Sequence, residues 1–311
     1  MNLPAGYAAR PSRAGDIDGA LAILHARDLL EVGRPDATSG WIEDAWRSPR
    51  VDVATDTRVV EAPDGSLAAY ADVTRVDDPA YVTSWAPVHP AHRGLGVGTA
   101  LLGWIEGRAS TLPARALHQH VEGGDVAGRD LLERAGFRVV RTHLHMVRDL
   151  DEGAPATPAG DAPVAIRPMH EGDERAVHHV MRVAFAEHFA LTVEPFDVWW
   201  GEWSADPLFD PDLFLLAEYA AAGIVGVACD FEDAGVGWVG DLGVLPAWRG
   251  RGIATALLAA SFDAFRGRGL ATARLNVDAE NETGAADLYR SVGMREHRRF
   301  LVFEKALGAA G

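Results

Sequence analysis

The sequence predicts a mixed α/β fold in which one domain occurs twice in tandem, each copy a mostly antiparallel sheet flanked by helices. Three short motifs recur along the 311 residues at nearly constant spacings of 157, 156 and 157 residues. Such a constant spacing across separate motifs indicates that a whole domain was duplicated. The paired motifs are residues 9–16 with 166–173, residues 88–102 with 244–258, and residues 131–137 with 288–294.

A linker is expected between the two copies. Residues 150–164 are rich in Ala, Pro, Gly and acidic side chains and show no apolar periodicity, which is typical of a connecting segment. We therefore expect an N-terminal domain over 1–149, a linker over 150–164 and a C-terminal domain over 165–311. Each part is long enough to bury a core of its own.

The same order of elements is expected in both copies. A short strand leads through a Gly-Asp turn into an amphipathic helix, and a less regular tryptophan-containing stretch follows. A meander of strands, a glycine loop, a long helix, a late strand, a short helix and two closing strands complete each copy. Because the late strand follows a helix, we expect it to run parallel to the strand before the glycine loop. The expected elements are strand Tyr7–Arg10, helix Ile17–Asp28, strands Thr57–Ala62, Leu67–Val73 and Tyr81–Val88, and late strand Ala114–Val121 in the first copy; and strand Val164–Arg167, helix Glu174–Phe189, strands Leu213–Tyr219, Gly223–Phe231 and Gly237–Leu245, and late strand Thr272–Val277 in the second.

The glycine loops carry the strongest functional signal. In the second copy an apolar strand ends in Val244–Pro246, and Arg249–Gly252 then leads directly into an apolar helix. Glycine lets the backbone N–H groups of such a loop turn inward, and the helix adds its partly positive N-terminus. Together they predict an anion cradle, most naturally for a pyrophosphate. The helix has no phosphate-loop Lys followed by Ser or Thr, so a nucleoside triphosphate is not expected.

Composition limits the partners of the protein. The formal net charge of −16 disfavours nucleic acid and is compatible with a cationic or amine-bearing small substrate. No apolar run approaches the roughly 18 residues of a membrane-spanning helix, and no export signal is visible at the N-terminus. A single cysteine, Cys229, excludes an intrachain disulfide and a cysteine cluster for zinc. We expect a cytoplasmic protein without a metal, monomeric or homodimeric.

The pattern Arg-x-x-Gly-x-Gly/Ala, after a strand that ends in Val-x-Pro, resembles the acetyl-CoA motif of the GNAT N-acetyltransferase superfamily. Both copies carry it, as Arg93–Gly98 and as Arg249–Ala254. Residues 276–294 of the second copy resemble the second signature of this family, with Asn281 and Tyr289 at the positions that usually meet CoA. The tandem arrangement is similar to that of mycothiol synthase and related bacterial acetyltransferases. The resemblance implies two GNAT-like domains and transfer of an acetyl group from acetyl-CoA to the primary amine of a small molecule, by direct attack in the C-terminal domain.

The resemblance also implies roles for individual residues. The backbones of Leu242, Gly243 and Val244 would meet the thioester and the pantetheine arm where the family's strand bulges, and Gly243 suits a bulge. Tyr289 would protonate the departing thiolate. The pyrophosphate would lie against Arg249, Gly250, Arg251, Gly252, Ile253, Ala254 and Thr255. In the first copy the CoA-binding residues would be Ala86, Val88, Arg93, Gly94, Gly96, Gly98 and Thr99.

The base that deprotonates the amine is the open question of the site. An amine with a pKa of ~10.4 is mostly protonated at neutral pH, so a group must take its proton. Many relatives place a Glu six residues before the Val of Val-x-Pro, and here that position is Trp238. Asp241 is the only carboxylate in this strand, and period-two alternation puts it on the opposite face unless a bulge intervenes. A solvent-facing Asp241 is an equal alternative, with His188, Glu194 or water as the base.

The first copy departs further from the family pattern. Leu132 stands at the position of Tyr289, Trp85 stands at the position of Asp241, and no asparagine matches Asn281. We therefore expect the first copy to keep its CoA loop and to be catalytically silent. The alternative for the whole chain is a non-catalytic protein that binds or senses acyl-CoA, which the missing strand carboxylate favours and the retained Tyr289 disfavours.

Overall fold

The computed structural model describes the chain except for residues 77–79, 152–163, 187–192, 281–283 and 309–311. The chain forms two compact units, Met1–His143 with Arg298–Gly311, and Leu144–His297. Two long strands, β7 (Arg138–Asp149) and β13 (Arg295–Ala306), each contain residues of both units. The expected boundaries place the last residues of the chain in the C-terminal domain, whereas in the structure Arg298–Gly311 belongs to the first unit.

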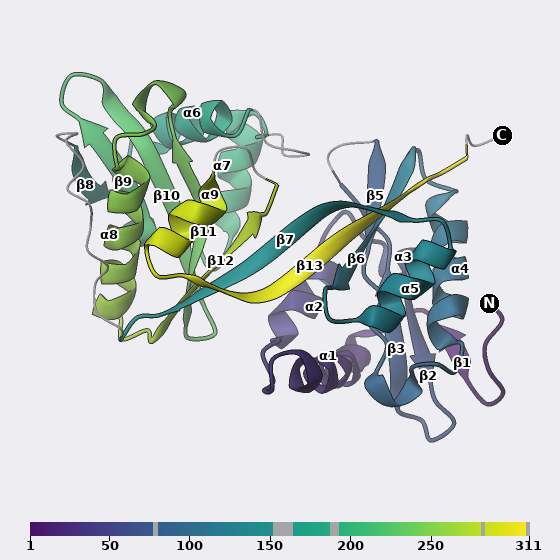
Figure 1. Cartoon of the computed structure of the whole chain (residues 1–311). Helices are drawn as coiled ribbons and strands as arrows, with labels where there is room; N and C mark the ends of the chain where they lie inside the picture. Colours follow the sequence, from purple (N-terminus) through teal and green to yellow (C-terminus); the bar gives the residue numbers. More distant parts are fainter. Residues whose placement is uncertain (77–79, 152–163, 187–192, 281–283, 309–311) are drawn as a thin grey trace. The chain divides into compact units, whose positions relative to one another are not determined.

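The first unit contains a small antiparallel sheet of order β1-β2-β3 and strands β4, β5, β6 and β13 of a second sheet (Figure 1). Strand β5 runs parallel to β6, as expected for the strand that follows the long helix. The C-terminal part of β13 pairs antiparallel with β6, from Phe300 opposite Glu122 to Ala306 opposite Ala116. The elements before β7 are β1 (Ala8–Arg10), η1 (Ala14–Asp16), α1 (Ile17–Glu31), α2 (Ser39–Arg47), α3 (Val53–Asp56), β2 (Thr57–Glu61), β3 (Leu67–Asp72), β4 (Thr74–Arg75), β5 (Tyr81–Ser84), η2 (Pro90–His92), α4 (Val97–Ala109), β6 (Ala116–Glu122) and α5 (Val126–Arg134).

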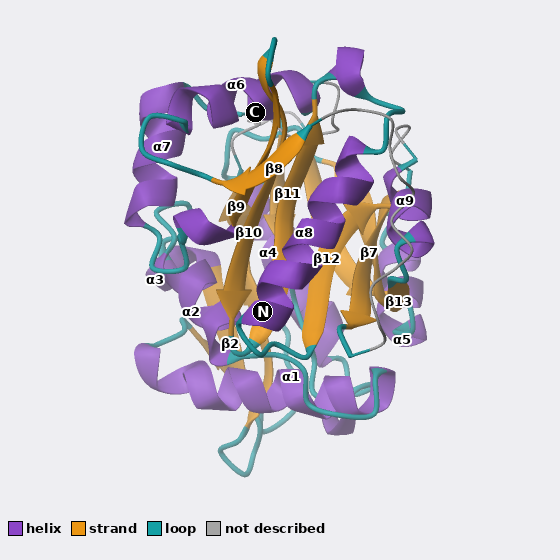
Figure 2. Ribbon diagram, turned by 90° about the vertical axis from the view of Figure 1, so that its left-hand side faces the viewer, coloured by secondary structure: helices purple, strands orange, loops and turns teal. Residues whose placement is uncertain are grey.

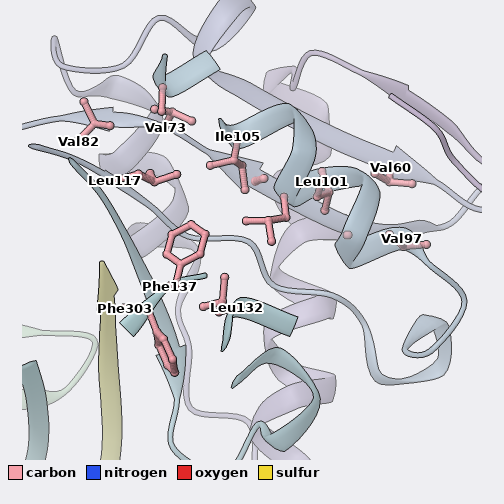
Figure 3. Packing of buried hydrophobic residues seen from close by; sticks show 14 of the residues in the cluster. Val60, Val73, Val82, Val97, Leu101, Ile105, Leu117, Leu132, Phe137 and Phe303 are labelled. Atoms are coloured by element: carbon pink, nitrogen blue, oxygen red, sulfur yellow. The ribbon is translucent and has the colours of Figure 1, made fainter. Parts of the chain in front are cut away.

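The core of the first unit depends on the end of the chain. Figure 3 shows Phe303 of β13 in one cluster with Leu117, Leu132 and Phe137. Phe303 and Leu117 are fully buried, and Leu132 and Phe137 nearly so. Helix α4 supplies further apolar side chains such as Ile105, which explains why this long helix has few polar positions.

The second unit is built on strands in the order β7-β12-β11-β10-β9-β8. The strands from β8 to β11 are antiparallel neighbours, and β11 and β12 are parallel. These relations confirm the predicted mixed, mostly antiparallel sheet. The elements between β7 and β13 are β8 (Ala165–Pro168), α6 (Glu174–Ala184), α7 (Phe196–Ala205), η3 (Pro211–Leu213), β9 (Phe214–Tyr219), β10 (Gly223–Asp233), β11 (Val236–Val244), η4 (Pro246–Trp248), α8 (Ile253–Gly267), β12 (Thr272–Asp278) and α9 (Ala285–Ser291).

Helices cover both faces of this sheet. Helix α8 packs on β9, β10 and β11 (Figure 2) and closes an apolar cluster that contains Ala228 and Leu257. Helices α6 and α7 cover the opposite face, where Val227 and Cys229 of β10 belong to a separate cluster. Alternate residues of β10 thus enter different cores, as period-two alternation requires.

Two expectations about local structure were wrong. The tryptophan-containing stretches are helices, α2 and α7, because their aromatic side chains pack on α1 and α6. Each copy also ends in one long strand, β7 or β13, instead of two closing strands.

Helix α6 ends at Ala184, and residues 187–189 of its predicted range lie outside the described residues. None of the helices in the described part of the chain combines the length and apolar character that a membrane span needs.

Candidate active site

The glycine loop has the same backbone in both units. Gly94 and Gly96 have φ angles of +74° and +91°, and Gly250 and Gly252 have φ angles of +73° and +74°. Residues with a side chain rarely adopt this left-handed backbone conformation, which explains the glycines at all four positions. Gly96 and Gly252 are the N-cap residues of α4 and α8, so the loop delivers N–H groups to a helix N-terminus. Both loops therefore have the geometry of the predicted anion cradle.

In the second unit, strands β11 and β12 diverge before the loop. Among the described residues their parallel register covers only Gly237 with Ala273 and Trp238 with Arg274. The Leu245 N–H donates to the Val225 carbonyl at 3.0 Å, so alternation directs the backbone groups of Gly243 toward β10. The backbone groups of Leu242 and Val244 face the opening between the two strands.

A bulge interrupts β11 at Gly240. Asp241 lies opposite Cys229 and Val239 lies opposite Asp230, which leaves Gly240 without a partner in the register. A Cβ atom at Gly240 would lie 2.5 Å from the Cys229 carbonyl oxygen, so only glycine fits. The expectation of a bulge at Gly243 was wrong, since that residue pairs regularly with Val227. Its missing side chain makes room for α6, because a Cβ atom there would lie 3.1 Å from the Ala184 Cβ.

The bulge brings Asp241 to the face of the sheet that carries Trp238. Cys229 and Phe231 lie two residues apart on β10 and share a face. Their partners across the register are Asp241 and Trp238. Without the bulge, these two residues of β11 would lie on opposite faces. Burial raises the pKa of the Asp241 carboxyl from 3.8 to about 6.

Tyr289 lies on the short helix α9, as predicted, and is 8% exposed. Burial raises the pKa of its phenol above the ordinary value, and the carboxyl groups of Asp241 and Asp230 raise it further at the pH where they are ionised. The phenol therefore keeps its proton at neutral pH. At the matching position of the first unit, Leu132 is buried and offers no proton.

Asp230 is a buried carboxyl group that none of the sequence motifs indicates. It is fully buried, and burial raises its pKa to about 8, an effect that the Ser261 hydroxyl on α8 opposes. In the sequence, this buried carboxyl group could be recognised as an acidic residue directly after the apolar run Ile224–Cys229. The carboxyl is mostly neutral at pH 7.

Arg249 ties the loop of the second unit to its surroundings. Its guanidinium donates to the Val244 carbonyl at 3.2 Å and to the Ala184 carbonyl at 3.0 Å. Its neighbour Arg251 lies over the ring of Trp248, with 4.9 Å between the guanidinium carbon and the ring centroid. The two arginine side chains therefore hold the loop in place. The predicted binding of pyrophosphate depends on the backbone from Arg249 through Ile253, Ala254 and Thr255 in the first turn of α8.

The first unit contains a cavity of about 420 Å³ between the diverging strands and the loop. The register of β5 and β6 ends at Ser84 opposite Gln119, and residues 85–88 and 119–121 form two walls beyond that point. Leu132 closes the cavity from α5. All seven residues predicted for this unit line the cavity: Ala86, Val88, Arg93, Gly94, Gly96, Gly98 and Thr99.

The cavity also contains polar side chains that the sequence motifs do not predict. Gln119 and His120 of β6 and Arg27 of α1 line it. Burial lowers the pKa of His120 to about 4, and the charges of His143 and His118 lower it further. The only sequence signal for Gln119 is a polar residue in a strand that also carries Leu117 and Val121.

Some predicted site residues are not brought together here. Asn281 and His188 lie outside the described residues. Glu194 is half-buried just before α7, where its carbonyl contacts the His178 ring at 2.7 Å. Asp241 and Tyr289 are close enough for the carboxylate of Asp241 to raise the pKa of the Tyr289 phenol.

Comparison with known proteins identifies the family. The model of the acetyltransferase (GNAT) family matches residues 27–137 and 175–294, which is most of both units. The chain belongs to the GNAT acetyltransferase family. It is therefore an acetyl-CoA-dependent N-acetyltransferase, and the tandem architecture expected from the repeat is confirmed.

Relatives of this GNAT protein extend over most of its length. The mycothiol acetyltransferase of Kineococcus radiotolerans is 34% identical over 82% of this chain and 83% of the relative. The mycothiol acetyltransferase of Streptomyces griseus is 34% identical over 77% of each chain. A crystal structure of a GCN5-related N-acetyltransferase from Sphaerobacter thermophilus is 33% identical, with a TM-score of 0.86 over 98% of this chain and 97% of the other. A tandem GNAT protein from the clavulanic acid biosynthesis pathway is 18% identical over 98% of this chain and all of the other, with a TM-score of 0.74, and shares the fold.

Proposed function

We propose that the protein transfers the acetyl group of acetyl-CoA to the primary amine of a small molecule, and that this chemistry takes place in the second unit. The observation that supports it most is the bulge at Gly240, which places Asp241 on the face of Trp238 beside the opening of the strands. The first unit offers Trp85 and Leu132 at the positions of Asp241 and Tyr289. At these two matching positions, only the second unit offers a carboxyl group and a phenol.

Asp241 is the proposed base. Because its pKa is about 6, the carboxyl group is mostly ionised at pH 7 and can accept the proton of the attacking amine. Burial brings this pKa close to the working pH, where a general base is most effective.

The reaction also needs a donor that stabilises negative charge on the thioester carbonyl oxygen and an acid that protonates the departing thiolate. The backbone and Tyr289 supply these two groups. The N–H groups of Leu242 and Val244 face the opening, where they would stabilise negative charge on the carbonyl oxygen of the thioester, and one such donor contributes roughly 3 kcal/mol. The phenol of Tyr289 keeps its proton and would donate it to the departing thiolate. The loop from Arg249 to Thr255, with Asn281, would hold the coenzyme.

The names of the relatives suggest an acceptor. Two relatives of 34% identity are mycothiol acetyltransferases, so the amine of the mycothiol precursor is the first acceptor to test. Trp238 stands where the resemblance implies a glutamate, and a bulky aromatic ring there changes the shape and the charge of the acceptor site. We therefore propose a small-molecule amine as the acceptor class and the mycothiol precursor as one member of it.

Thiol release tests this function. Purified full-length protein with acetyl-CoA is offered a panel of amines that includes the mycothiol precursor, and free CoA thiol is measured. Turnover with at least one amine is expected. Tight binding of acetyl-CoA without thiol release from any amine would instead favour the alternative of a binding or sensing protein.

Replacing Tyr289 with Phe is expected to lower kcat by about 100-fold, because a positioned proton donor contributes 10²–10⁴-fold. The ring stays in its apolar cluster, so the KM for acetyl-CoA should change by less than about three-fold. Steady-state kinetics with thiol detection measures both constants. Equal losses in kcat and in acetyl-CoA affinity would make Tyr289 a packing residue.

Replacing Gly252 with Val is expected to abolish acetyl-CoA binding in the second unit, and turnover with it. A β-branched residue is strained at a φ of +74°, and the loop N–H groups would turn away from the anion. The matched control is Gly267→Ala at the end of α8, where a Cβ atom meets open space. Turnover that survives in Gly252→Val would refute the role of this loop.

A further inference from the structure

Gln119 lines the cavity of the first unit and carries a buried hydrogen-bond donor that has no partner among the described residues. Its side chain is only 3% exposed, and it lines the cavity. Its amide nitrogen has no hydrogen-bond partner within the described residues. Buried amide groups are nearly always paired in folded proteins, so an unpaired one in a cavity wall points to a ligand atom that accepts its hydrogen bond.

The cavity has two chemically different ends. At one end lie Gly94 and Gly96 with positive φ and the N-terminus of α4, which together form an anion cradle. At the other end the paired part of β5 and β6 stops at Ser84 opposite Gln119. Between the two ends, the walls include the apolar side chains of Val88, Leu102 and other residues. The cavity thus accepts a molecule with an anionic head and a long, weakly polar arm.

We propose that Gln119 donates a hydrogen bond to the thioester carbonyl of an acyl-CoA bound in the first unit, so that this unit distinguishes acylated from free CoA. The proposal rests on the proposed role of the loop as a pyrophosphate cradle. With the pyrophosphate held there, the thiol end of the coenzyme extends toward Gln119. A carbonyl attached to the sulfur exists only in the thioester, which free CoA lacks.

The surroundings of Gln119 favour retention of the thioester over its use. Leu132 closes the cavity where the second unit has the proton donor Tyr289. Trp85 lies where the second unit has Asp241, and the guanidinium carbon of Arg27 lies 5.7 Å from the centroid of its ring. The first unit therefore holds a donor for the carbonyl but has neither the carboxyl group nor the phenol that the second unit carries at the matching positions.

Calorimetric titration of the full chain with acetyl-CoA and with CoA tests the proposal. The variant Gly252→Val disables the site of the second unit, so one acetyl-CoA per chain is expected where the unmodified chain takes two. In that background acetyl-CoA should bind about ten-fold more tightly than CoA, the gain of one hydrogen bond. Adding Gln119→Met, which keeps the length of the side chain and removes its donor, should weaken acetyl-CoA about ten-fold and CoA less than two-fold.

The control is His118→Gln, because the His118 side chain contacts Glu304 at 2.9 Å and does not line the cavity. It should leave both affinities within about two-fold, and thermal unfolding reports whether either variant is misfolded. Equal affinities for acetyl-CoA and CoA in the Gly252→Val chain, equal losses for both ligands in Gln119→Met, or no binding at all would each overturn the proposal. Thiol release by the unmodified chain is measured separately, so failure here is distinct from failure of the proposed function of the second unit.

Discussion

Replacing Asp241 with Asn is expected to lower kcat for acetyl transfer by two to four orders of magnitude while the affinity for acetyl-CoA stays within about three-fold. The amide has nearly the same shape but cannot accept the proton of the amine, and loss of a general base has an effect of this size. Thiol-release kinetics and direct titration with acetyl-CoA measure the two quantities. A variant that keeps more than a tenth of the original kcat would exclude Asp241 as the base.

The pH profile gives an independent check on the same residue. Burial raises the pKa of Asp241 to about 6, so kcat should fall about ten-fold per pH unit below that value, as the carboxylate is protonated. Asp241→Asn should lose this acidic limb. A profile of the unmodified enzyme that stays flat down to pH 5 would contradict the assignment.

The free energy of unfolding should depend on pH in the opposite direction to kcat. Asp241 has a higher pKa in the folded chain than the value of 3.8 in the unfolded chain. The folded state therefore binds more protons than the unfolded state between these values, and the free energy of unfolding decreases as the pH rises from about 3.8 to 6. At pH 7 the Asn variant should be more stable than the original, by at most about 3 kcal/mol. Urea denaturation at pH 7 and at pH 4 measures the difference, which should vanish at the lower pH.

Truncating the chain after His297 is expected to unfold the first unit, although that unit begins with Met1. The deletion removes the partner of β6 over seven register positions and the fully buried Phe303. It also removes Arg298, which donates to Glu122 at 2.9 Å and to Asp28. Both carboxyl groups are buried and would lose this cation.

Hydrogen exchange followed by mass spectrometry measures this effect, because amides of β6 should lose their protection. Truncation after Leu307 keeps the whole of β13 and serves as the control. The milder variant Phe303→Ala should lower the free energy of unfolding by about 3–5 kcal/mol, as for other large-to-small changes of buried aromatic residues. Unchanged protection of β6 in the chain that ends at His297 would show that β13 is dispensable for the first unit.

The features that are best predicted from the sequence depend on residues that are close together in the chain. The repeat, the parallel late strand and the loops around Gly96 and Gly252 are fixed by spacing, by connection length and by the need for positive φ. Each of these can be recognised from a few neighbouring residues. The presence of Tyr289 in one copy and Leu132 in the other follows from alignment of the repeat.

The remaining features depend on contacts between distant residues. The position of the bulge was ambiguous because β11 contains several glycines, and the deciding contact of Gly240 is with the Cys229 carbonyl on another strand. The pairing of β13 with β6 was missed because an alternating strand pattern specifies a face and not a partner. Gln119 was missed for a related reason, since it lies between Ser84 of β5 and Phe303 of β13, which are distant from it in the sequence.

The order in which the parts of the first unit leave the ribosome follows from the place of β13. Strand β6 ends at Glu122, and the paired part of β13 begins at Phe300, so the whole of the second unit, Leu144–His297, is translated in between. At about 5–20 residues per second, this interval is on the order of ten to forty seconds. During that time the nascent first unit carries an open strand edge and an unfilled core position, which are sites for chaperones and for mispairing. Synthesis of β13, and not completion of the first half of the chain, is therefore the event that allows the first unit to close.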